Sequence, residues 1–330
     1  MKYVIISEES NYSSMFKVLF NDLCIKKNSV FLDKYFCQRS KLYIFLMRVL
    51  YKKEINKYLK SKFEFFLRPD FNLINTLNKY NKEKICVIFN NSSVNKYYNE
   101  YTLKSIREKY PNVKFVLYFV DSIFQCKNTN AVKLAKTGIF DLVYTYSKPD
   151  AEKYGYLYYP TPYSKINNLP QNTIKGIYFC GNEKGRTELL KDIAVQCKKL
   201  GVTYNFDVEG NPDNSNKYFQ IREGNIKKYT DVVKKTINYN CILDLTQKSL
   251  DGSKPGLSLR VYEALVYDRV LITNNPLIKE FKYYNPKTMH YIKSASEIKK
   301  EWVINKVKNN YNGQFSPLNF AKDIEKRLNL

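Results

Sequence analysis

The feature that most limits how this chain can fold is an alternation, along its whole length, of short apolar runs with helix-like stretches. The apolar runs that we expect to form strands are 3–7, 29–33, 85–89, 113–119, 141–147, 174–181, 202–210, 239–245 and 269–274. The stretches with helical periodicity are 13–24, 39–66, 98–109, 129–137, 185–200, 226–237, 257–266 and 295–309. Continuous apolar strands that alternate with helices are typical of parallel sheets with helices on both faces. The sequence therefore predicts an α/β protein.

The length of 330 residues exceeds that of most single domains. The segment 160–173 holds three prolines and many polar residues and has no helical period, which indicates a linker. We therefore expect two α/β domains, residues 1–165 and 166–330. The final segment 316–330 starts with a Ser-Pro helix-entry signal and is amphipathic, so we expect a helix that packs back toward the N-terminal domain.

The net charge of +24 favours an anionic partner, and both halves of the chain are basic. Nucleic acid, phospholipid head groups and phosphorylated small molecules all fit this charge. The seven cysteines are scattered without a C-x-x-C pair, which indicates reduced thiols in the cytosol. We expect no signal peptide, because a strand-like run begins at residue 3. The longest uninterrupted apolar runs, 42–47 and 115–120, are far shorter than the roughly 20 residues that span a bilayer.

The segment 39–68 combines nine Lys or Arg residues and two Glu with apolar residues at helical spacing. A basic amphipathic helix is a candidate for docking on an anionic membrane surface. The alternative is a helix whose apolar face packs on the core and whose basic face is solvated. The pattern alone leaves both interpretations open.

Several common site motifs are absent from the sequence. It has no G-x-G-x-x-G, no G-x-x-x-x-G-K-[ST] and no D-x-D pair. Its single histidine, His290, argues against histidine-based metal sites, Ser-His-Asp triads and Cys-His dyads. We interpret His290 as structural, and we expect no metal site and no cofactor.

Two stretches carry residues suited to binding a phosphorylated ligand, and the first is 177–193. Here a strand ends near Gly181, and a polar turn leads into a helix near Arg186. Ligands of open α/β sheets bind at such strand-to-helix turns. Gly181 and Gly185 allow a close approach of the backbone, while Lys184 and Arg186 carry the charge to neutralise a pyrophosphate. The alternative is an ordinary turn with exposed basic residues.

The second stretch is 251–275, a loop, a helix and a strand. The loop contains Gly256, and Ser258 is placed to cap the helix, whose free N–H groups form an anion site. Arg260 and Glu263 follow one turn apart on an otherwise apolar helix. Arg suits a phosphate, and a carboxylate suits the two hydroxyls of a ribose. The alternative is a surface ion pair worth less than about 1 kcal/mol.

Together the two stretches resemble the C-terminal half of bacterial GT-B-fold glycosyltransferases from capsule and lipopolysaccharide gene clusters. The resemblance rests on "GLSLRVYEALVYDRVLITNN" (256–275) and "FCGNEKGRTELL" (179–190), with weaker matches at 140–163 and 284–292. It implies two facing Rossmann-like domains with parallel sheets and an active site in the cleft between them. The C-terminal domain would hold the nucleotide-sugar donor, and the N-terminal domain the acceptor.

The resemblance also implies roles for single residues. Glu263 matches the glutamate that binds the donor ribose in related retaining enzymes, and Gly181 matches a loop glycine near the phosphates. Lys184 and Arg186 match the basic residues that hold the diphosphate. The chain departs from the paired E-x7-E pattern, because Pro255 stands eight positions before Glu263. Either Asp251 substitutes for the missing Glu or nothing does, so retention and inversion of the anomeric centre both stay open.

An inverting enzyme needs a general base close to the acceptor hydroxyl. Without an N-terminal histidine, the candidates are carboxylates that follow strands. They are Glu8 and Glu9 after the first strand and Asp121 after the run 115–120, with Glu9 and Asp121 preferred. Solvent exposure of Glu8 and Glu9, and helix capping or a salt bridge for Asp121, are the alternatives.

We therefore expect a metal-independent glycosyltransferase that uses a nucleoside-diphosphate sugar. The acceptor would be a cell-surface saccharide, carried on a polyprenyl lipid at the cytoplasmic face of the membrane, with the enzyme cytoplasmic or peripherally bound there. A nucleic-acid-binding protein is one alternative, although the charge is spread over both halves and no recognition motif is present, so no nucleic-acid partner is expected. A non-catalytic GT-B-like subunit that binds a saccharide is the other.

Overall fold

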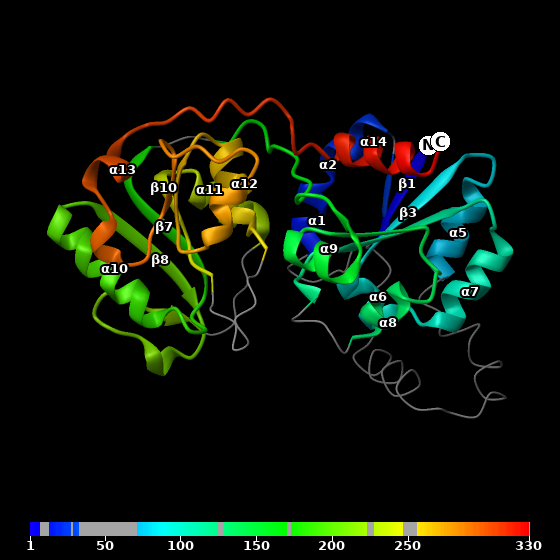
Figure 1. Cartoon of the computed structure of the whole chain (residues 1–330), viewed down its shortest axis with the longest axis horizontal. Coiled ribbons are helices and arrows are strands. Elements are labelled where there is room, and N and C mark those ends of the chain that lie inside the picture. The colour runs from blue at the N-terminus through cyan, green and yellow to red at the C-terminus, as the bar shows by residue number, and fades with distance from the viewer. Residues whose placement is uncertain are drawn as a thin grey trace. The chain divides into compact units, whose positions relative to one another are not determined.

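The computed structural model describes residues 1–6, 13–27, 29–32, 71–123, 129–169, 173–222, 228–246 and 256–329. These residues form two compact units (Figure 1). The first comprises Met1–Pro162 and Pro317–Leu330, and the second comprises Tyr163–Ser316. The sequence placed the boundary between residues 165 and 166, whereas the structure places it at Pro162 and returns the C-terminal segment to the first unit.

The first unit is built on a six-stranded parallel sheet with the strand order β2-β1-β3-β4-β5-β6. The strands are β1 (Lys2–Ile6), β2 (Val30–Leu32), β3 (Ile85–Asn90), β4 (Lys114–Phe119), β5 (Leu142–Thr145) and β6 (Leu157–Tyr158). The helices are α1 (Ser13–Leu19), α2 (Asn21–Lys26), α5 (Phe71–Lys79), α6 (Asn91–Tyr97), α7 (Glu100–Lys109), α8 (Asn130–Ala135), α9 (Lys148–Tyr154) and α14 (Pro317–Arg327).

Both faces of this sheet are covered. Apolar residues of α5, α6, α7 and α8 form one core with the strand residues on that face. On the other face Phe320 of α14 packs its ring against Phe20, Tyr118 and Tyr144. The hydroxyl of Tyr144 donates to Asp323 of the same helix at 2.7 Å. The C-terminal helix is therefore an integral layer of the first unit.

The second unit has a six-stranded parallel sheet with the order β12-β11-β10-β7-β8-β9. The strands are β7 (Ile174–Asn182), β8 (Thr203–Glu209), β9 (Ile221–Arg222), β10 (Tyr239–Asp244), β11 (Val270–Thr273) and β12 (Met289–Tyr291). The helices are α10 (Thr187–Leu200), α11 (Tyr229–Thr236), α12 (Leu259–Val266) and α13 (Lys300–Ile304), with short 3₁₀ turns η2 (Pro212–Asn214), η3 (Pro276–Glu280) and η4 (Ala295–Glu297).

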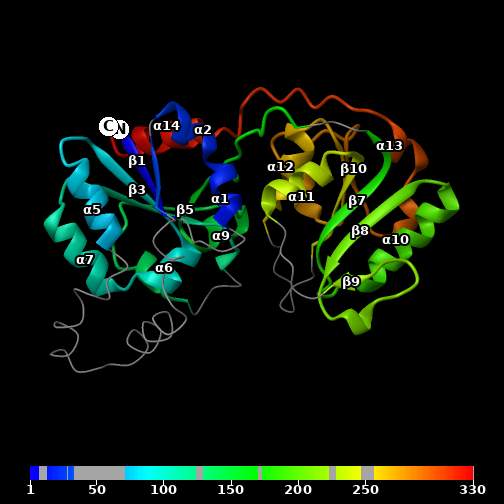
Figure 2. The same ribbon diagram turned by 180° about the vertical axis from the view of Figure 1, so that it is seen from behind.

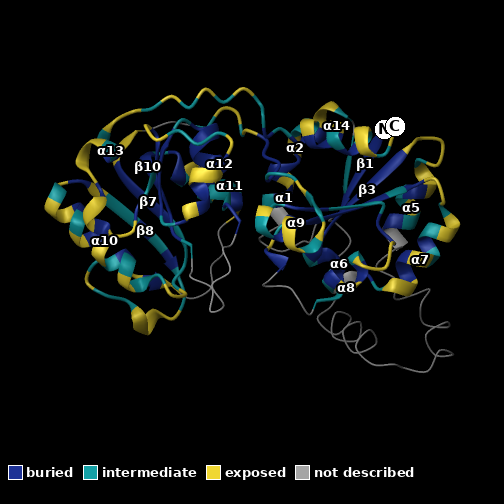
Figure 3. Cartoon of the chain, in the orientation of Figure 1, coloured by how far each residue is buried: buried dark blue, intermediate teal, exposed yellow. Residues whose placement is uncertain are grey.

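Helices α10 and α13 lie on one face of this second sheet, and α11 and α12 lie on the other (Figure 2). The neighbouring strands β10 and β11 are buried along their whole length, and Figure 3 shows this for β10. Burial on both faces explains why these strands read as continuous apolar runs rather than as alternating ones. The predicted α/β class with parallel sheets is confirmed.

The structure corrects several predicted elements. The predicted helix 295–309 is a 3₁₀ turn followed by the short helix α13, which ends at Ile304. The amide of Asn240 donates to the carbonyl oxygen of Ile304 at 2.8 Å, and the next residue, Asn305, is already extended. The predicted helix 13–24 is two helices, and the short strands β6 and β9 were not predicted. The basic segment 39–68 lies outside the described residues, and none of the described helices is both long and apolar enough to cross a membrane.

Candidate functional site

Polar residues of the second unit gather at the carboxyl end of its sheet, between β7 and β10. From β7 the chain builds outward through β8 and β9, and it then returns through α11 to place β10 on the other side of β7. The strand order therefore reverses between β7 and β10. Open α/β sheets bind ligands at such a switch point, outside the carboxyl ends of the strands. Strand β7 ends there at Asn182, and β10 ends at Asp244.

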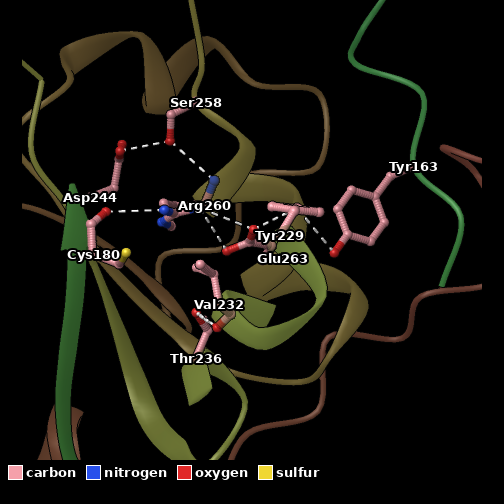
Figure 4. Close-up of polar contacts among 9 residues, drawn as sticks. All are labelled: Tyr163, Cys180, Tyr229, Val232, Thr236, Asp244, Ser258, Arg260 and Glu263. Atoms are coloured by element: carbon pink, nitrogen blue, oxygen red, sulfur yellow. Dashed lines mark hydrogen bonds and ion pairs between the residues drawn. The ribbon is translucent and has the colours of Figure 1, made fainter. Parts of the chain in front are cut away.

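Arg260 and Glu263 lie one turn apart on α12 and form an ion pair at this position (Figure 4). Nη1 of Arg260 donates to Oε1 of Glu263 at 3.0 Å and to Oε2 at 3.2 Å. Nη2 donates to the carbonyl oxygen of Cys180, near the end of β7, at 3.0 Å. The Glu263 side chain is 0% exposed and that of Arg260 is 19% exposed. The two residues do pair with each other, but inside the unit, so the alternative of a surface ion pair is wrong.

Tyr229 adds a third polar group to this pair. It is the first residue of α11, and its hydroxyl donates to Oε1 of Glu263 at 2.7 Å. The hydroxyl oxygens of Tyr229 and Tyr163 lie 3.4 Å apart, so the buried Tyr163 at the start of the unit joins the same network (Figure 4). Glu263 is thus enclosed by groups from two helices and from the segment that opens the second unit.

Burial and charge pairing together determine the pKa values in this cluster. Burial raises the pKa of Glu263 above its ordinary value, although Arg260 and Tyr229 both act to lower it. Burial acts to lower the pKa of Arg260, but the Glu263 carboxylate outweighs it and raises that pKa overall. Burial, and then the nearby Glu263 carboxylate, raise the pKa of Tyr229 well above its usual value. The tyrosine therefore remains a neutral hydrogen-bond donor at physiological pH.

The start of α12 is fixed by a second set of bonds. The hydroxyl of Ser258 accepts from the backbone N–H of Arg260 at 3.1 Å, which makes Ser258 the N-cap of the helix. The same hydroxyl donates to Oδ1 of the buried Asp244 at 2.7 Å. Thr273, at the end of β11, donates to Oδ2 at 2.9 Å. One carboxylate therefore joins the ends of two strands to the start of α12.

Arg186 links the carboxyl end of β7 to the residue that follows β10. Its Nε donates to the carbonyl oxygen of Leu245 at 2.7 Å, and its Nη1 donates to that of Asn182 at 2.7 Å. Burial lowers the pKa of this guanidinium, and Asp244 partly offsets that effect. Two bonds to carbonyl oxygens fix the plane of the guanidinium at the switch point, just before α10 begins at Thr187.

The other predicted binding residues differ in burial and in backbone conformation. Gly181 is the penultimate residue of β7, and a Cβ at that position would lie 3.0 Å from the ring of Phe179. Gly185 has φ +64°, a left-handed conformation that suits glycine in the turn before α10. The Lys184 side chain is exposed, and its backbone N–H donates to Oδ1 of Asn182. Gly256 is buried, and its carbonyl oxygen accepts from Asn275 at 3.3 Å.

A pocket of about 540 Å³ adjoins the end of β7, within the range of small-molecule sites. It is lined by β7, β8, α11 and the segment that leads into β9. Cys180, whose carbonyl oxygen holds Arg260, forms part of its wall. Its lining includes the polar side chains of Asn205, Asp207, Glu209, Gln220 and Arg222. Among the described residues, no group of three or more His, Cys, Asp or Glu side chains is placed to hold a metal ion.

Of the two predicted catalytic carboxylates, the structure describes one. Asp121 is exposed just after β4, and the amide of Asn91 donates to its Oδ2 at 3.2 Å. Oδ1 of Asn91 accepts from the backbone of Val120 at 3.0 Å, so this buried asparagine fixes Asp121 at the carboxyl end of the first sheet. Glu9 and its neighbour Glu8 lie outside the described residues.

Three residues that organise these sites were not predicted. Asp244 is the last residue of an otherwise apolar strand, and that position was available as a signal. Asn91 directly follows the apolar strand β3. Tyr229 gave no local signal, because one tyrosine among thirty is not distinctive.

No protein-family model matches the chain, and no curated protein matches it. Among solved structures, it is similar to the catalytic domain of starch synthase IV from Arabidopsis thaliana bound to ADP and acarbose. The TM-score is 0.52 at 7% identity, over 99% of this chain and 98% of that one. A structure of S. aureus MnaA with UDP has a TM-score of 0.48 at 12% identity, over 100% of this chain and 97% of that one. With its two six-stranded parallel sheets, the chain has the GT-B fold.

Proposed function

We propose that this protein is a glycosyltransferase that takes a sugar from a nucleoside-diphosphate sugar. One observation carries the proposal. The switch point of the second sheet, beside a 540 Å³ pocket, holds two fixed guanidinium groups, those of Arg186 and Arg260. The GT-B fold and the resemblance of 179–190 and 256–275 to glycosyltransferase motifs support the same function.

In this proposal the diphosphate lies between α10 and α12. The N-terminus of α10 directs backbone N–H groups and the positive end of the helix dipole toward an anion. Arg186 and Arg260 supply planar, permanently charged donors that match phosphate oxygens. The pocket beside Cys180 then takes the rest of the nucleotide. Lys184, two residues before Arg186, is exposed and adds positive charge to the same turn.

The reaction needs charge stabilisation more than covalent chemistry. The acceptor hydroxyl attacks the anomeric carbon, the bond from that carbon to the diphosphate oxygen breaks, and negative charge develops on the leaving group. Fixed positive groups stabilise that charge without reorganising during the reaction. We propose that they make a metal ion unnecessary. We propose Asp121 or Glu9 as the general base that accepts the proton of the acceptor hydroxyl.

The acceptor that fits best is a surface saccharide on a polyprenyl diphosphate, as in capsule or lipopolysaccharide synthesis. The net charge of +24 and the basic segment 39–68 support docking on the inner face of an anionic membrane. Sedimentation with vesicles, with and without anionic lipid, tests this part. We expect binding that requires anionic lipid and weakens with salt, and no binding at low salt would remove the membrane proposal.

A thermal-shift screen against UDP, GDP, CDP and dTDP, with and without EDTA, tests the donor site. A ligand at a hundred times its Kd stabilises a protein by about 2.7 kcal/mol, so we expect one base to give a clear shift that EDTA does not change. Arg260→Lys, which keeps the charge and loses the planar fork, should lose most of that shift. Arg107→Lys is the matched control, because Arg107 makes a two-pronged pair with Asp141 at 2.7 and 2.8 Å in the first unit.

The outcomes separate the rival functions. A shift with no nucleotide contradicts a donor site. Nucleotide binding without sugar transfer to any lipid-linked saccharide indicates the non-catalytic subunit instead. Tight, strongly salt-dependent binding of nucleic acid that Arg260→Lys does not weaken indicates the nucleic-acid-binding alternative.

A further inference from the structure

The most enclosed charge in the candidate site is the carboxylate of Glu263. Its side chain is 0% exposed. Oε1 accepts from the hydroxyl of Tyr229 at 2.7 Å and from Nη1 of Arg260 at 3.0 Å. Oε2 accepts from the same Nη1 at 3.2 Å. Both oxygens are therefore engaged by other side chains of the unit.

A carboxylate in this state is poorly placed to bind a ribose. Two vicinal hydroxyls must reach its oxygens, and here α11 contributes Tyr229 and α12 contributes Arg260 at those oxygens. Because the side chain is fully buried, a ribose could reach these oxygens only by displacing Tyr229 or Arg260, and each displacement would break a hydrogen bond to a charged carboxylate. The member of the ion pair that keeps some exposure is Arg260, at 19%.

The bonds to Arg260 fix its guanidinium in one plane. Nη1 is held by Glu263, and Nη2 is held by the carbonyl oxygen of Cys180 at 3.0 Å. Cys180 is also part of the pocket wall, so the guanidinium is anchored to the strand that forms the proposed nucleotide site. Tyr229 in turn restrains the carboxylate that restrains Arg260.

We propose that Glu263 and Tyr229 are positioning residues, which hold Arg260 for the diphosphate of the donor, and that Glu263 does not bind the ribose. The inference rests on the proposed function and assigns the residues of that same site. It departs from the role that the resemblance implied for Glu263. It also gives Tyr229 a part in donor binding.

The two possible roles of Glu263 predict different relative affinities for nucleotides with and without ribose hydroxyls or a second phosphate. Calorimetric titration measures these affinities. The probes are UDP, 2′,3′-dideoxy-UDP and UMP, or the same set for whichever base the thermal-shift screen selects. A positioning role predicts that Glu263→Gln and Tyr229→Phe weaken UDP binding by about tenfold and UMP binding by much less. It also predicts that the affinity ratio of UDP to its dideoxy analogue stays at the wild-type value in both variants.

The chain offers a matched control in Tyr144→Phe. The Tyr144 hydroxyl is also that of a buried tyrosine and also donates to a carboxylate at 2.7 Å, but to Asp323 in the first unit. We expect Tyr144→Phe to bind all three probes like the wild type. Thermal unfolding checks that each variant is folded, and Tyr229→Phe carries the test if Glu263→Gln is not, because it removes a single oxygen atom.

Each other outcome contradicts the inference in a distinct way. A ratio of UDP to dideoxy-UDP affinity that falls to about one in Glu263→Gln would show that this carboxylate binds the ribose. Unchanged affinities in both variants would show that neither residue positions Arg260. If the wild-type protein binds none of the nucleotides, the proposed function fails and the inference fails with it.

Discussion

Burial of the Glu263 carboxylate changes how its ion pair with Arg260 contributes to stability. At a surface, Arg260 and Glu263 would contribute little to stability, because solvent screens the pair. Inside the second unit, with Glu263 fully buried, each charge needs the other and needs hydrogen bonds as well. The two charges are therefore coupled, so removing one of them should cost more stability than removing both.

This difference is measurable by urea unfolding. We expect Arg260→Met to destabilise the protein by about 3 kcal/mol, because it leaves the Glu263 carboxylate buried without its cation. The double variant Arg260→Met with Glu263→Leu should recover much of that loss, since apolar groups then replace both charges. Additive losses in the double variant would contradict a coupled buried pair.

His290 provides a second prediction for a single residue. Its ring stacks on that of Trp302 with centroids 3.9 Å apart, and burial, then Lys299, lower its pKa to about 4. The unfolded chain, with an ordinary histidine pKa near 6.5, binds more protons between these values. Stability should therefore fall as the pH drops from about 6.5 toward 4. The test is to measure the urea midpoint of unfolding across that pH range. The midpoint should fall less steeply with decreasing pH in His290→Phe, which keeps an aromatic ring. The same pH dependence in both proteins would contradict the lowered pKa of His290.

At the scale of elements, α12 depends on a cap that the strands provide. Ser258 caps the helix and donates to Asp244 at the end of β10, so the sheet sets where the helix starts. Arg260 and Glu263 follow within the first turns of the same helix. Removing the cap should therefore also disturb the positions of Arg260 and Glu263 in the binding site.

We expect Ser258→Ala to lower stability by about 1 kcal/mol, the usual cost of losing a side-chain cap. It should also weaken nucleotide binding severalfold, because it loosens the start of α12. Ser147→Ala is the control, since Ser147 caps α9 in the first unit by accepting from the N–H of Asp150 at 3.3 Å. It should lower stability without changing the Kd for nucleotide. Equal effects of both variants on the Kd would refute a local role for the α12 cap.

The sequence predicted the longer strands well, because a strand buried on both faces appears in the sequence as a continuous apolar run. It failed where distant residues decide the outcome. Helix α13 ends at Ile304, and Asn240, far away in the sequence, donates to the carbonyl oxygen of that last residue. The two-residue strand β9 exists only by pairing with β8. The site motifs were visible in the sequence, which allowed Arg186, Arg260 and Glu263 to be chosen. The burial of Glu263 could not be predicted, because Tyr229, which helps to enclose it, is distant in the sequence.

At the scale of the whole molecule, the chain leaves the first unit after Pro162 and returns to it at Pro317. The returning helix α14 supplies Phe320, which is fully buried against four aromatic rings of that unit. The candidate donor site lies wholly within the second unit. Stability of the first unit and nucleotide binding by the second should therefore respond to different substitutions.

Phe320→Ala tests this separation. Removing a buried phenyl ring typically costs about 3–5 kcal/mol. In hydrogen exchange we expect β1, β3 and β4 to lose protection while β7 and β10 keep it, and we expect the Kd for nucleotide to stay unchanged. Loss of protection in β7 and β10 to the same extent would mean that the two units unfold together.

The central claim, that the carboxyl ends of β7 and β10 bind a nucleoside diphosphate, is tested most directly by a crystal structure with the nucleotide that the screen selects. The account predicts diphosphate density within hydrogen-bond distance of Arg186, Arg260 or the first N–H groups of α10, with Glu263 still bonded to Tyr229. Diphosphate density anywhere else on the chain would contradict the claim.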